Sequence, residues 1–267
     1  MEFQNLSCER RDAILVVTLN RPQKLNSLSL GLLKDLKSCV EAIQRDRSLR
    51  AVLLTGAGRG FCAGADLTDP DGMPAAGQSM GQLMASRLRE YYNPLALMLC
   101  NLPVPLVVAL NGVSAGAGSS LALLGDITVA GRSASLTFVF APKLGLVPDM
   151  GATHLLARRI GEARARALAL TGRPIGAEEA EQIGLIAECV DDADLAGRAM
   201  QVATDLAAGP REAFIGVRNL MASAVRSSLP EQLEAEAALQ ARLGDGADFV
   251  EGVTAFREKR APRFGTR

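Results

Sequence analysis

Two glycine-rich turns and one aspartate are the parts of this sequence whose residue types and spacing could carry chemistry. The turns span residues 56–66 and 111–120, and Asp149 follows Pro148. Each turn follows an apolar run typical of a strand, and the second opens a helix, whose first N–H groups have no partner inside the helix. Small residues leave such donors accessible to an oxyanion or a polarised carbonyl. We therefore predict paired backbone donors, beside which Asp149 could move a proton.

Neither turn carries a nucleotide-binding fingerprint, because GxxxxGK[ST] is absent and Phe61 stands where the third glycine of GxGxxG would be. The second turn contains GxSxG around Ser114, the pattern of the nucleophile elbow in serine hydrolases. A hydrolase would also need His154, the sole histidine, with Asp126 or Asp149 as the acid. A serine hydrolase therefore remains an alternative at this point.

The elements that must position these groups follow from the apolar pattern. Apolar runs predict strands at residues 13–20, 51–55, 106–110, 127–130 and 136–140. Helical spacing predicts helices over residues 28–43, 83–100 and 121–124, and residues 67–81, rich in Gly, Pro and Asp, are expected to form a loop. After residue 145 the chain is predicted to be almost wholly helical. The alternation predicts an α/β fold, with a core over residues 1–195 and a helical region over residues 196–267.

Composition narrows the class of protein. The 267 residues are 48% apolar and 22% charged with zero formal net charge, so a basic nucleic-acid-binding surface is not expected. No charge-free apolar run approaches the ~18 residues of a membrane span, and the polar N-terminus lacks a signal-peptide pattern. The five cysteines are scattered, so we expect no disulfide framework and no metal site, in a cytoplasmic protein.

Six segments carry a resemblance that covers nearly the whole chain. They are residues 21–28 (RPQKLNSL), 60–67 (GFCAGADL), 111–118 (NGVSAGAG), 145–153 (GLVPDMGAT), 172–180 (GRPIGAEEA) and 256–260 (FREKR). In this order and spacing they resemble the enoyl-CoA hydratase/isomerase, or crotonase, superfamily. The resemblance implies a spiral of ββα units, a C-terminal helical trimerisation region, and a homotrimer or a dimer of trimers.

The resemblance also implies a site. The backbone N–H groups of Ala65 and Ala117 would form an oxyanion hole, with Asp149 as the catalytic acid and base. The substrate would be an acyl-CoA, so that CoA is part of the substrate and no separate cofactor is expected. The residues that would bind CoA are Lys24, Leu25, Ala63, Ala65, Asp66, Leu67, Phe256 and Lys259.

Departures from the family pattern indicate the reaction. The family's hydratases place glutamates where this chain has Ser120 and Ala141, and hydration needs two such groups. Asp149 alone favours an isomerase. Residues 54–64, 92–95 and 248–256 resemble the ring-1,2-epoxyphenylacetyl-CoA isomerases of phenylacetate degradation, although Ala65 stands where that subgroup has glutamine. The implied reactions are conversion of 1,2-epoxyphenylacetyl-CoA to oxepin-CoA and of 3-enoyl-CoA to 2-enoyl-CoA.

Several alternatives stay open. Another crotonase reaction could apply, such as enoyl-CoA hydration, thioester hydrolysis or dehalogenation, as could non-catalytic binding of a CoA ester. Asp149 could instead be a turn residue or helix cap, and Asp66 could brace its loop. Residues 138–140 could form the walls of an apolar pocket around Asp149, or an ordinary strand. Tyr91 and Tyr92 could line the acyl pocket or belong to the core.

Overall fold

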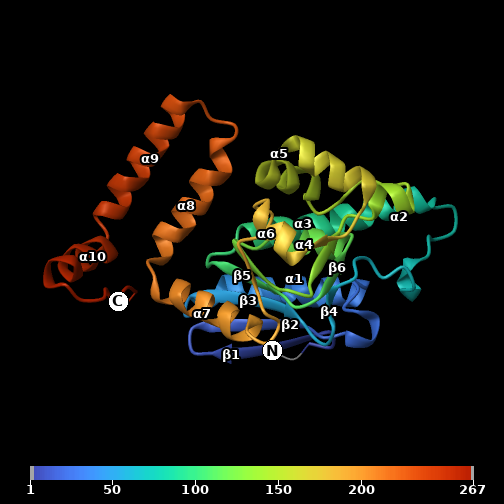
Figure 1. Ribbon diagram of the computed structural model, residues 1–267, viewed down its shortest axis with the longest axis horizontal. Helices are drawn as coiled ribbons and strands as arrows, with labels where there is room; N and C mark the ends of the chain where they lie inside the picture. Colours follow the sequence, from blue (N-terminus) through green and yellow to red (C-terminus); the bar gives the residue numbers. More distant parts are fainter. Residues whose placement is uncertain (1–2, 266–267) are drawn as a thin grey trace.

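The computed structural model describes residues 3–265, which form a twisted six-stranded sheet with helices on both faces (Figure 1). Strand β1 runs antiparallel to β2, and all other neighbours in this sheet are parallel. In spatial order the strands are β1 (Leu6–Arg11), β2 (Ile14–Leu19), β3 (Ala51–Gly56), β5 (Leu106–Leu110), β7 (Ile127–Gly131) and β10 (Glu188–Val190).

A second sheet of very short strands lies beyond the carboxyl ends of β3, β5 and β7. It consists of β4 (Gly60–Cys62), β6 (Val113–Ala115), β8 (Ser135–Thr137) and β9 (Ile175–Gly176). Each of the first three follows directly from a strand of the large sheet and leads toward a helix. The chain therefore repeats a strand–strand–helix unit, which confirms the predicted crotonase-like α/β fold.

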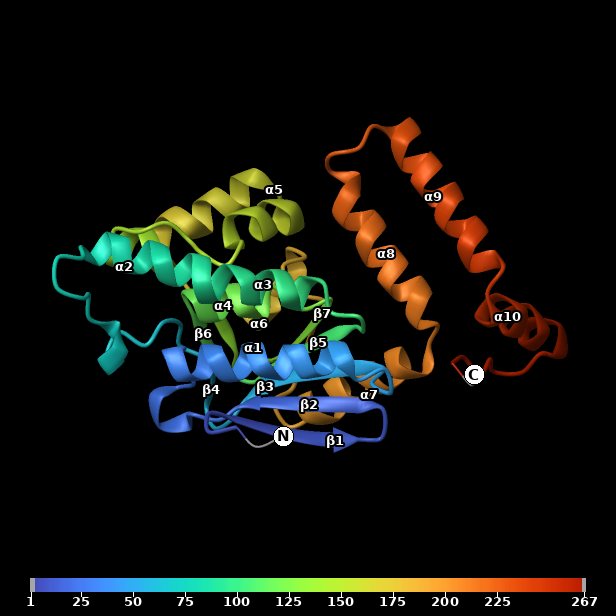
Figure 2. The same ribbon diagram turned by 180° about the vertical axis from the view of Figure 1, so that it is seen from behind.

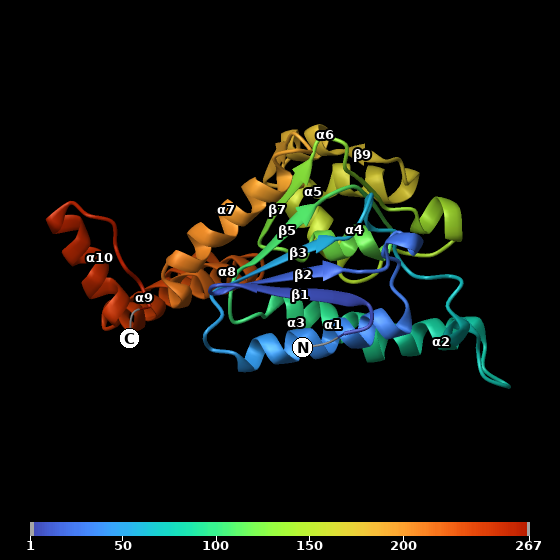
Figure 3. The same ribbon diagram turned by 90° about the horizontal axis from the view of Figure 1, so that it is seen from below.

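Alternation along the central strands assigns side chains to the two faces of the large sheet. In β3, Val52 and Leu54 pack into one core with α1 (Leu30–Arg45) and α3 (Asn93–Cys100), whereas Ala51 and Leu53 face the opposite side. Helix α7 (Leu195–Ala208) covers that opposite face through Leu195, Ala199, Val202 and Ala203. Figure 3 shows the strands between α7 and the α1–α3 layer. Successive side chains of a strand point to opposite faces, so a strand that is covered on both faces is apolar along its whole length.

The remaining helices of the core are α2 (Met80–Arg87), α4 (Ala117–Ala122), α5 (Ala152–Thr171) and α6 (Ala177–Gln182). Helix α5 is interrupted at Gly161, whose φ of 76° and ψ of 158° separate a first part, residues 152–160, from a second. Among the described residues, no helix is both long enough and apolar enough to cross a lipid bilayer.

The last three helices project away from the core, as Figures 1 and 2 show. They are α8 (Arg211–Ala224), α9 (Leu229–Gly244) and α10 (Ala247–Glu258). Arg218, in the middle of α8, ties this helix to the core, because its guanidinium donates to both carboxylate oxygens of Asp126 and to the carbonyls of Leu102 and Val104. Apolar side chains remain exposed along these helices: Val217, Met221, Leu229, Leu233, Phe249, Val250 and Phe256.

The predicted secondary structure differs from the structure at several elements, among them the short strands β4 and β6 inside the glycine-rich turns. Residues 6–11 form strand β1, which the polar N-terminal pattern concealed because this edge strand exposes most of its side chains. The strand predicted over residues 136–140 is only β8, followed by a π-helical turn, Phe140–Leu144. The prediction of an almost wholly helical chain after residue 145 is wrong at β9 and β10. Strands of two or three residues are too short to show a period.

Candidate active site

The first glycine-rich turn is held by backbone hydrogen bonds to the segment before α1. The N–H of Ala63 donates to the Leu25 carbonyl at 2.9 Å, and the N–H of Leu28 donates to the Gly64 carbonyl at 2.7 Å. The N–H of Asp66 donates back to Leu28 at 3.1 Å. Between these bonds, the N–H of Ala65 has no acceptor among residues 3–265. The turn therefore presents one fixed, unpaired donor.

The second turn presents its own donor at the start of α4. Gly116, with φ of 52° and ψ of −128°, is the N-cap of this helix, and its N–H donates to the Thr137 carbonyl at 2.9 Å. The next N–H, that of Ala117, has no acceptor in the described part of the chain, as expected for the first residue of a helix. Ala117 itself is 2% exposed, so its donor sits at a largely buried position.

The two turns approach each other backbone to backbone. A Cβ atom added to Gly64 would lie 2.6 Å from the Ala115 carbonyl oxygen and 3.4 Å from the Ala117 nitrogen. A Cβ atom added to Gly118 would lie only 2.0 Å from the Cys62 carbonyl oxygen. Glycine is thus required at both positions for the close approach. The predicted pair of donors, Ala65 and Ala117, is brought together in one place.

Asp149 lies in the turn that leads into α5, and its side chain does not cap the helix. The N-cap residue of α5 is Gly151, and no side chain accepts a hydrogen bond from the first N–H groups of the helix. The N–H of Ala152 donates to the main-chain carbonyl of Asp149 at 3.0 Å, not to its carboxylate. Oxygen Oδ1 of Asp149 is buried without a hydrogen-bond partner among the described residues. The capping alternative is therefore wrong for this side chain, and a buried unpaired carboxylate oxygen is left in the fold.

The carboxyl group of Asp149 is largely withdrawn from water, and Tyr92 lies near enough to sense its charge. Burial raises the pKa of Asp149 to about 6, against an ordinary value of 3.8. Burial raises the pKa of Tyr92 as well, and the nearby charges of Asp149 and Cys62 raise it further. At the second turn, a Cβ on Gly116 would lie 3.7 Å from both Val139 and Phe140. Residues 139 and 140 therefore stand beside the donor turn, outside any strand, which supports their interpretation as pocket walls.

The raised pKa has an expected consequence for pH dependence. If Asp149 is the base, it must be ionised in the free enzyme, so kcat/KM should rise with pH through an apparent pKa of about 6. The fold favours the neutral carboxyl. This group's contribution to the free energy of unfolding should therefore be greatest below pH 3.8 and decline toward about pH 6. A pH profile of kcat/KM, with urea unfolding across the same range, measures both. An acidic limb near pH 4 would contradict a buried base.

Arg159, which sequence reasoning did not single out, joins the two halves of the site. Its guanidinium donates to the carbonyls of Leu123 at 2.6 Å, Gly125 at 3.0 Å and Leu185 at 3.0 Å. Leu123 ends α4, whose first residue is Ala117, and Arg159 lies in the part of α5 that follows Asp149 and precedes the break at Gly161. The side chain therefore fixes the carboxylate-bearing segment relative to the donor-bearing helix.

Replacing Arg159 by Ala should loosen this connection. Loss of three charge-assisted hydrogen bonds should lower the free energy of unfolding by roughly 3 kcal/mol. The turnover number should fall about tenfold or more, because a displacement of ~1 Å in a site can cost about 10²-fold. Arg158→Ala is the control, since exposed Arg158 instead donates to carbonyls of α8. An unchanged kcat in Arg159→Ala, measured well below its Tm, would contradict the positioning role.

Several residues predicted to bind CoA lie around the first turn. Lys24 donates through Nζ to the Thr68 hydroxyl at 3.2 Å, and the same hydroxyl donates to Asp66 at 2.8 Å. The carboxylate of Asp66 also forms an ion pair with Arg21 at 2.8 Å. Asp66 thus braces its loop, which was one of the two roles considered for it. Leu67 is 76% exposed beside them. Together with Leu25 and Ala63, these residues form one cluster.

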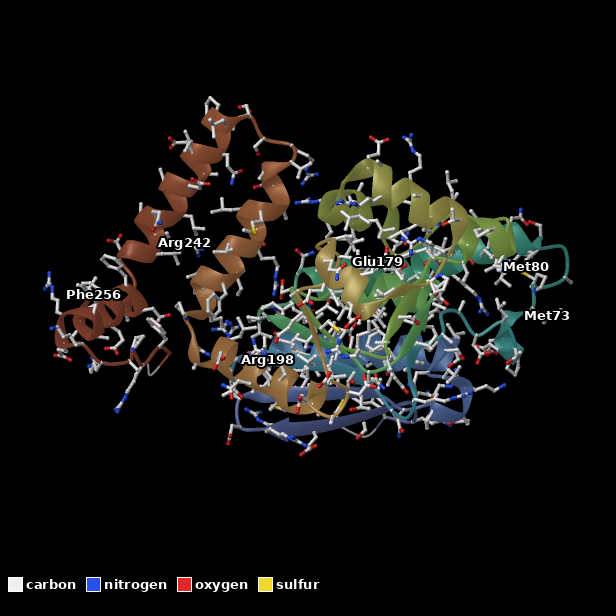
Figure 4. The ribbon with its side chains drawn as sticks, in the orientation of Figure 1. Met73, Met80, Glu179, Arg198, Arg242 and Phe256 are labelled. Atoms are coloured by element: carbon white, nitrogen blue, oxygen red, sulfur yellow. The ribbon has the colours of Figure 1, made fainter. Side chains whose placement is uncertain are left out.

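Two residues predicted to bind CoA lie elsewhere in the chain. Phe256, 85% exposed, lies on α10, and Lys259 is the C-cap of that helix. Figure 4 shows Phe256 at the opposite end of the molecule from Met73, in the loop after the first turn, and from Met80, the first residue of α2. Within one chain these two residues are therefore not part of the site.

The serine-hydrolase alternative fails on geometry. Ser114 is fully buried inside β6, and its hydroxyl has no partner among the described residues. His154, which a hydrolase would need as its base, lies on the exposed side of α5, where its Nε2 is 3.4 Å from Nη1 of Arg158. Cys62, in the first turn, is also fully buried, and burial raises the pKa of its thiol to about 12. Neither the Ser114 hydroxyl nor the Cys62 thiol is therefore an activated nucleophile.

Comparison with known proteins agrees with this geometry. Residues 9–267 match the enoyl-CoA hydratase/isomerase family, and the chain belongs to this family. It is 45% identical over 268 residues to the 1,2-epoxyphenylacetyl-CoA isomerase of Escherichia coli K12, covering 99% of this chain and 98% of the relative.

Solved structures with the same fold include an enoyl-CoA hydratase from Bacillus anthracis, with a TM-score of 0.90 and 33% identity, covering 99% of this chain and 100% of that chain. Another is an enoyl-CoA hydratase from Mycobacterium smegmatis, with a TM-score of 0.86 and 27% identity, covering 98% and 99%. The protein is therefore an enzyme of the enoyl-CoA hydratase/isomerase family, whose members act on CoA thioesters.

Proposed function

We propose that this enzyme is a CoA-thioester isomerase that converts 1,2-epoxyphenylacetyl-CoA to oxepin-CoA and can shift the double bond of a 3-enoyl-CoA into conjugation. The observation that carries the proposal is the buried carboxylate oxygen of Asp149, Oδ1, which has no hydrogen-bond partner among the described residues. The similarity to an epoxyphenylacetyl-CoA isomerase supports the choice of the epoxide. The positions that carry glutamates in the family's hydratases are occupied by Ser120 and Ala141.

The proposed mechanism uses the three groups together. The thioester carbonyl accepts hydrogen bonds from the N–H groups of Ala65 and Ala117, which stabilise the charge that develops on oxygen as an α-proton leaves. Asp149 takes that proton and returns one to another carbon, so that no atom is gained or lost. With an epoxide, the carbon–carbon bond of the three-membered ring breaks while both C–O bonds are kept, which gives the seven-membered oxepin, and Asp149 returns the proton taken from the α-carbon to a ring carbon. A pKa of about 6 suits a carboxyl group that acts first as base and then as acid.

The test is turnover of each proposed substrate by the wild-type enzyme. Conversion of a 3-enoyl-CoA is followed by absorbance of the conjugated 2-enoyl product, and conversion of the epoxide by chromatography and mass. A 2-enoyl-CoA incubated in parallel measures hydration by loss of the same absorbance. Fast hydration with no isomerisation would overturn the proposal, and ¹⁸O from water appearing in Asp149 would instead mark it as a nucleophile in hydrolysis or dehalogenation.

The exposed apolar side chains of α8, α9 and α10 support a further proposal, that these helices assemble the enzyme into a homotrimer or a dimer of trimers. In such an assembly Phe256 and Lys259 would reach the CoA of a neighbouring subunit. Light scattering coupled to size-exclusion chromatography measures the mass. A monomer with full activity and unchanged KM in Phe256→Ala would contradict both parts.

A further inference from the structure

Two thiols face each other between the edge of the sheet and the first helix. Sulfur Sγ of Cys8, in β1, lies 3.8 Å from Sγ of Cys39, in the third turn of α1. Cys39 is 1% exposed, whereas Cys8 is half-buried. Neither residue belongs to the candidate site.

The two sulfurs differ in their readiness to ionise. The hydrogen bond between them lowers the pKa of Cys8, and it raises the pKa of Cys39, as does the burial of Cys39. The more accessible sulfur is therefore also the one that becomes a thiolate first. A thiolate that an oxidant can reach, with a protonated thiol in contact behind it, has the arrangement of an attacking and a resolving cysteine.

The remaining cysteines lack this arrangement. Cys100 and Cys189 are half-buried, and neither has a sulfur within hydrogen-bonding distance in the described chain. Burial raises the pKa of both, and that of fully buried Cys62 to about 12. A disulfide needs sulfurs about 2.0 Å apart, so the pair of Cys8 and Cys39 is within a small side-chain movement of bonding.

We propose that Cys8 and Cys39 form an oxidation site at which a hydroperoxide closes a reversible disulfide between β1 and α1. The Cys8 thiolate attacks a peroxide oxygen, so that an S–O bond forms, the O–O bond breaks and hydroxide leaves, taking the thiol proton to become water. The Cys39 sulfur then attacks Cys8, forming the S–S bond and releasing a second water as the S–O bond breaks. In sum, two thiols and hydrogen peroxide give a disulfide and two waters.

The disulfide would tie the edge strand to the helix that packs beneath it. A cross-link between residues so far apart in sequence restricts the unfolded chain and raises Tm. Turnover should stay within about twofold of the reduced enzyme, because the bond closes where the backbone already packs and touches no group of the site. The modification would thus consume peroxide at a position where oxidation does no harm to catalysis.

The experiment exposes the full-length protein to hydrogen peroxide, then alkylates remaining thiols and maps peptides by mass. We expect an intact-mass loss of about 2 Da, reversed by dithiothreitol, and a peptide pair joined through Cys8 and Cys39. This bond should form at least about tenfold faster than Cys100 or Cys189 is oxidised, because the resolving thiol is already in contact. In Cys39→Ser, dimedone should trap a sulfenic acid on Cys8, and in Cys8→Ser, Cys39 should stay alkylatable only after unfolding.

The proposal is overturned if Cys8 and Cys39 both remain reduced while Cys100 or Cys189 is oxidised, or if the bonds found join different chains. A Tm that does not rise on oxidation would refute the stabilising cross-link. The wild-type peptide map decides the chemistry by itself should Cys8→Ser fail to fold.

Discussion

Replacing Asp149 by Asn is expected to lower kcat by about 10²–10⁴-fold, the usual contribution of a general acid or base, while the affinity for a CoA ester stays close to that of the wild type. Asparagine keeps the size of the side chain but cannot take up the α-proton. It also removes a buried group that the fold prefers to keep neutral, so the variant should unfold no more easily than the wild type at pH 8. Turnover of both proposed substrates, with binding measured by calorimetry, checks these expectations.

Asp245→Asn provides the matched control, because this exposed aspartate at the C-cap of α9 lies outside the site. It should leave kcat unchanged. Full activity of Asp149→Asn on both substrates would remove Asp149 from the mechanism. Loss of binding together with turnover would show instead that the carboxylate holds the substrate in place.

Replacing Gly118 by Ala is expected to have the second largest effect. The added methyl group would meet the Cys62 carbonyl oxygen at 2.0 Å, so the two turns must separate. The proposed donors, the N–H groups of Ala65 and Ala117, would then move apart, and loss of one oxyanion-hole donor typically costs about 10²–10³ in rate. Measurements of kcat at temperatures well below the Tm of the variant separate this loss from simple destabilisation.

Gly197→Ala is the corresponding control. Gly197 lies exposed in α7, where an added Cβ would meet nothing within 4 Å. The helix should gain up to about 1 kcal/mol, with kcat unchanged. A Gly118→Ala enzyme that keeps wild-type kcat would show that the contact between the turns does not set the geometry of the donors.

Much of the fold could be predicted from the sequence because its main strands are buried on both faces. Residues 106–110 form one strand, β5, with the predicted bounds, and every one of its side chains is buried. By contrast, β4 and β6 lie inside the glycine-rich turns, where three residues pair only because the neighbouring strands bring them together. Edge strand β1 carries mostly exposed side chains, so its sequence contains no apolar run from which a strand could be predicted.

The candidate site divides in the same way. Asp149 and the two turns could be found because each is a local pattern with a known family counterpart. Arg159 could not, since its three acceptors lie on segments up to 36 residues away and only the tertiary structure collects them. The contact between Cys8 and Cys39 is equally invisible in sequence, because 31 positions separate the two cysteines and nothing in their spacing indicates a pair.

The donors at Ala65 and Ala117 belong to the main chain, and this has a consequence for how the enzyme can change. No side-chain substitution deletes a main-chain N–H other than one to proline, so the proposed oxyanion hole should tolerate mutation as long as the glycines between the turns remain. The proposed proton-transferring group, Asp149, is by contrast a single side chain. New reactivity can therefore be explored by varying positions 120, 141 and 149 while activation of the substrate carbonyl persists. A library restricted to these positions is the natural starting point for redesigning this enzyme toward hydration.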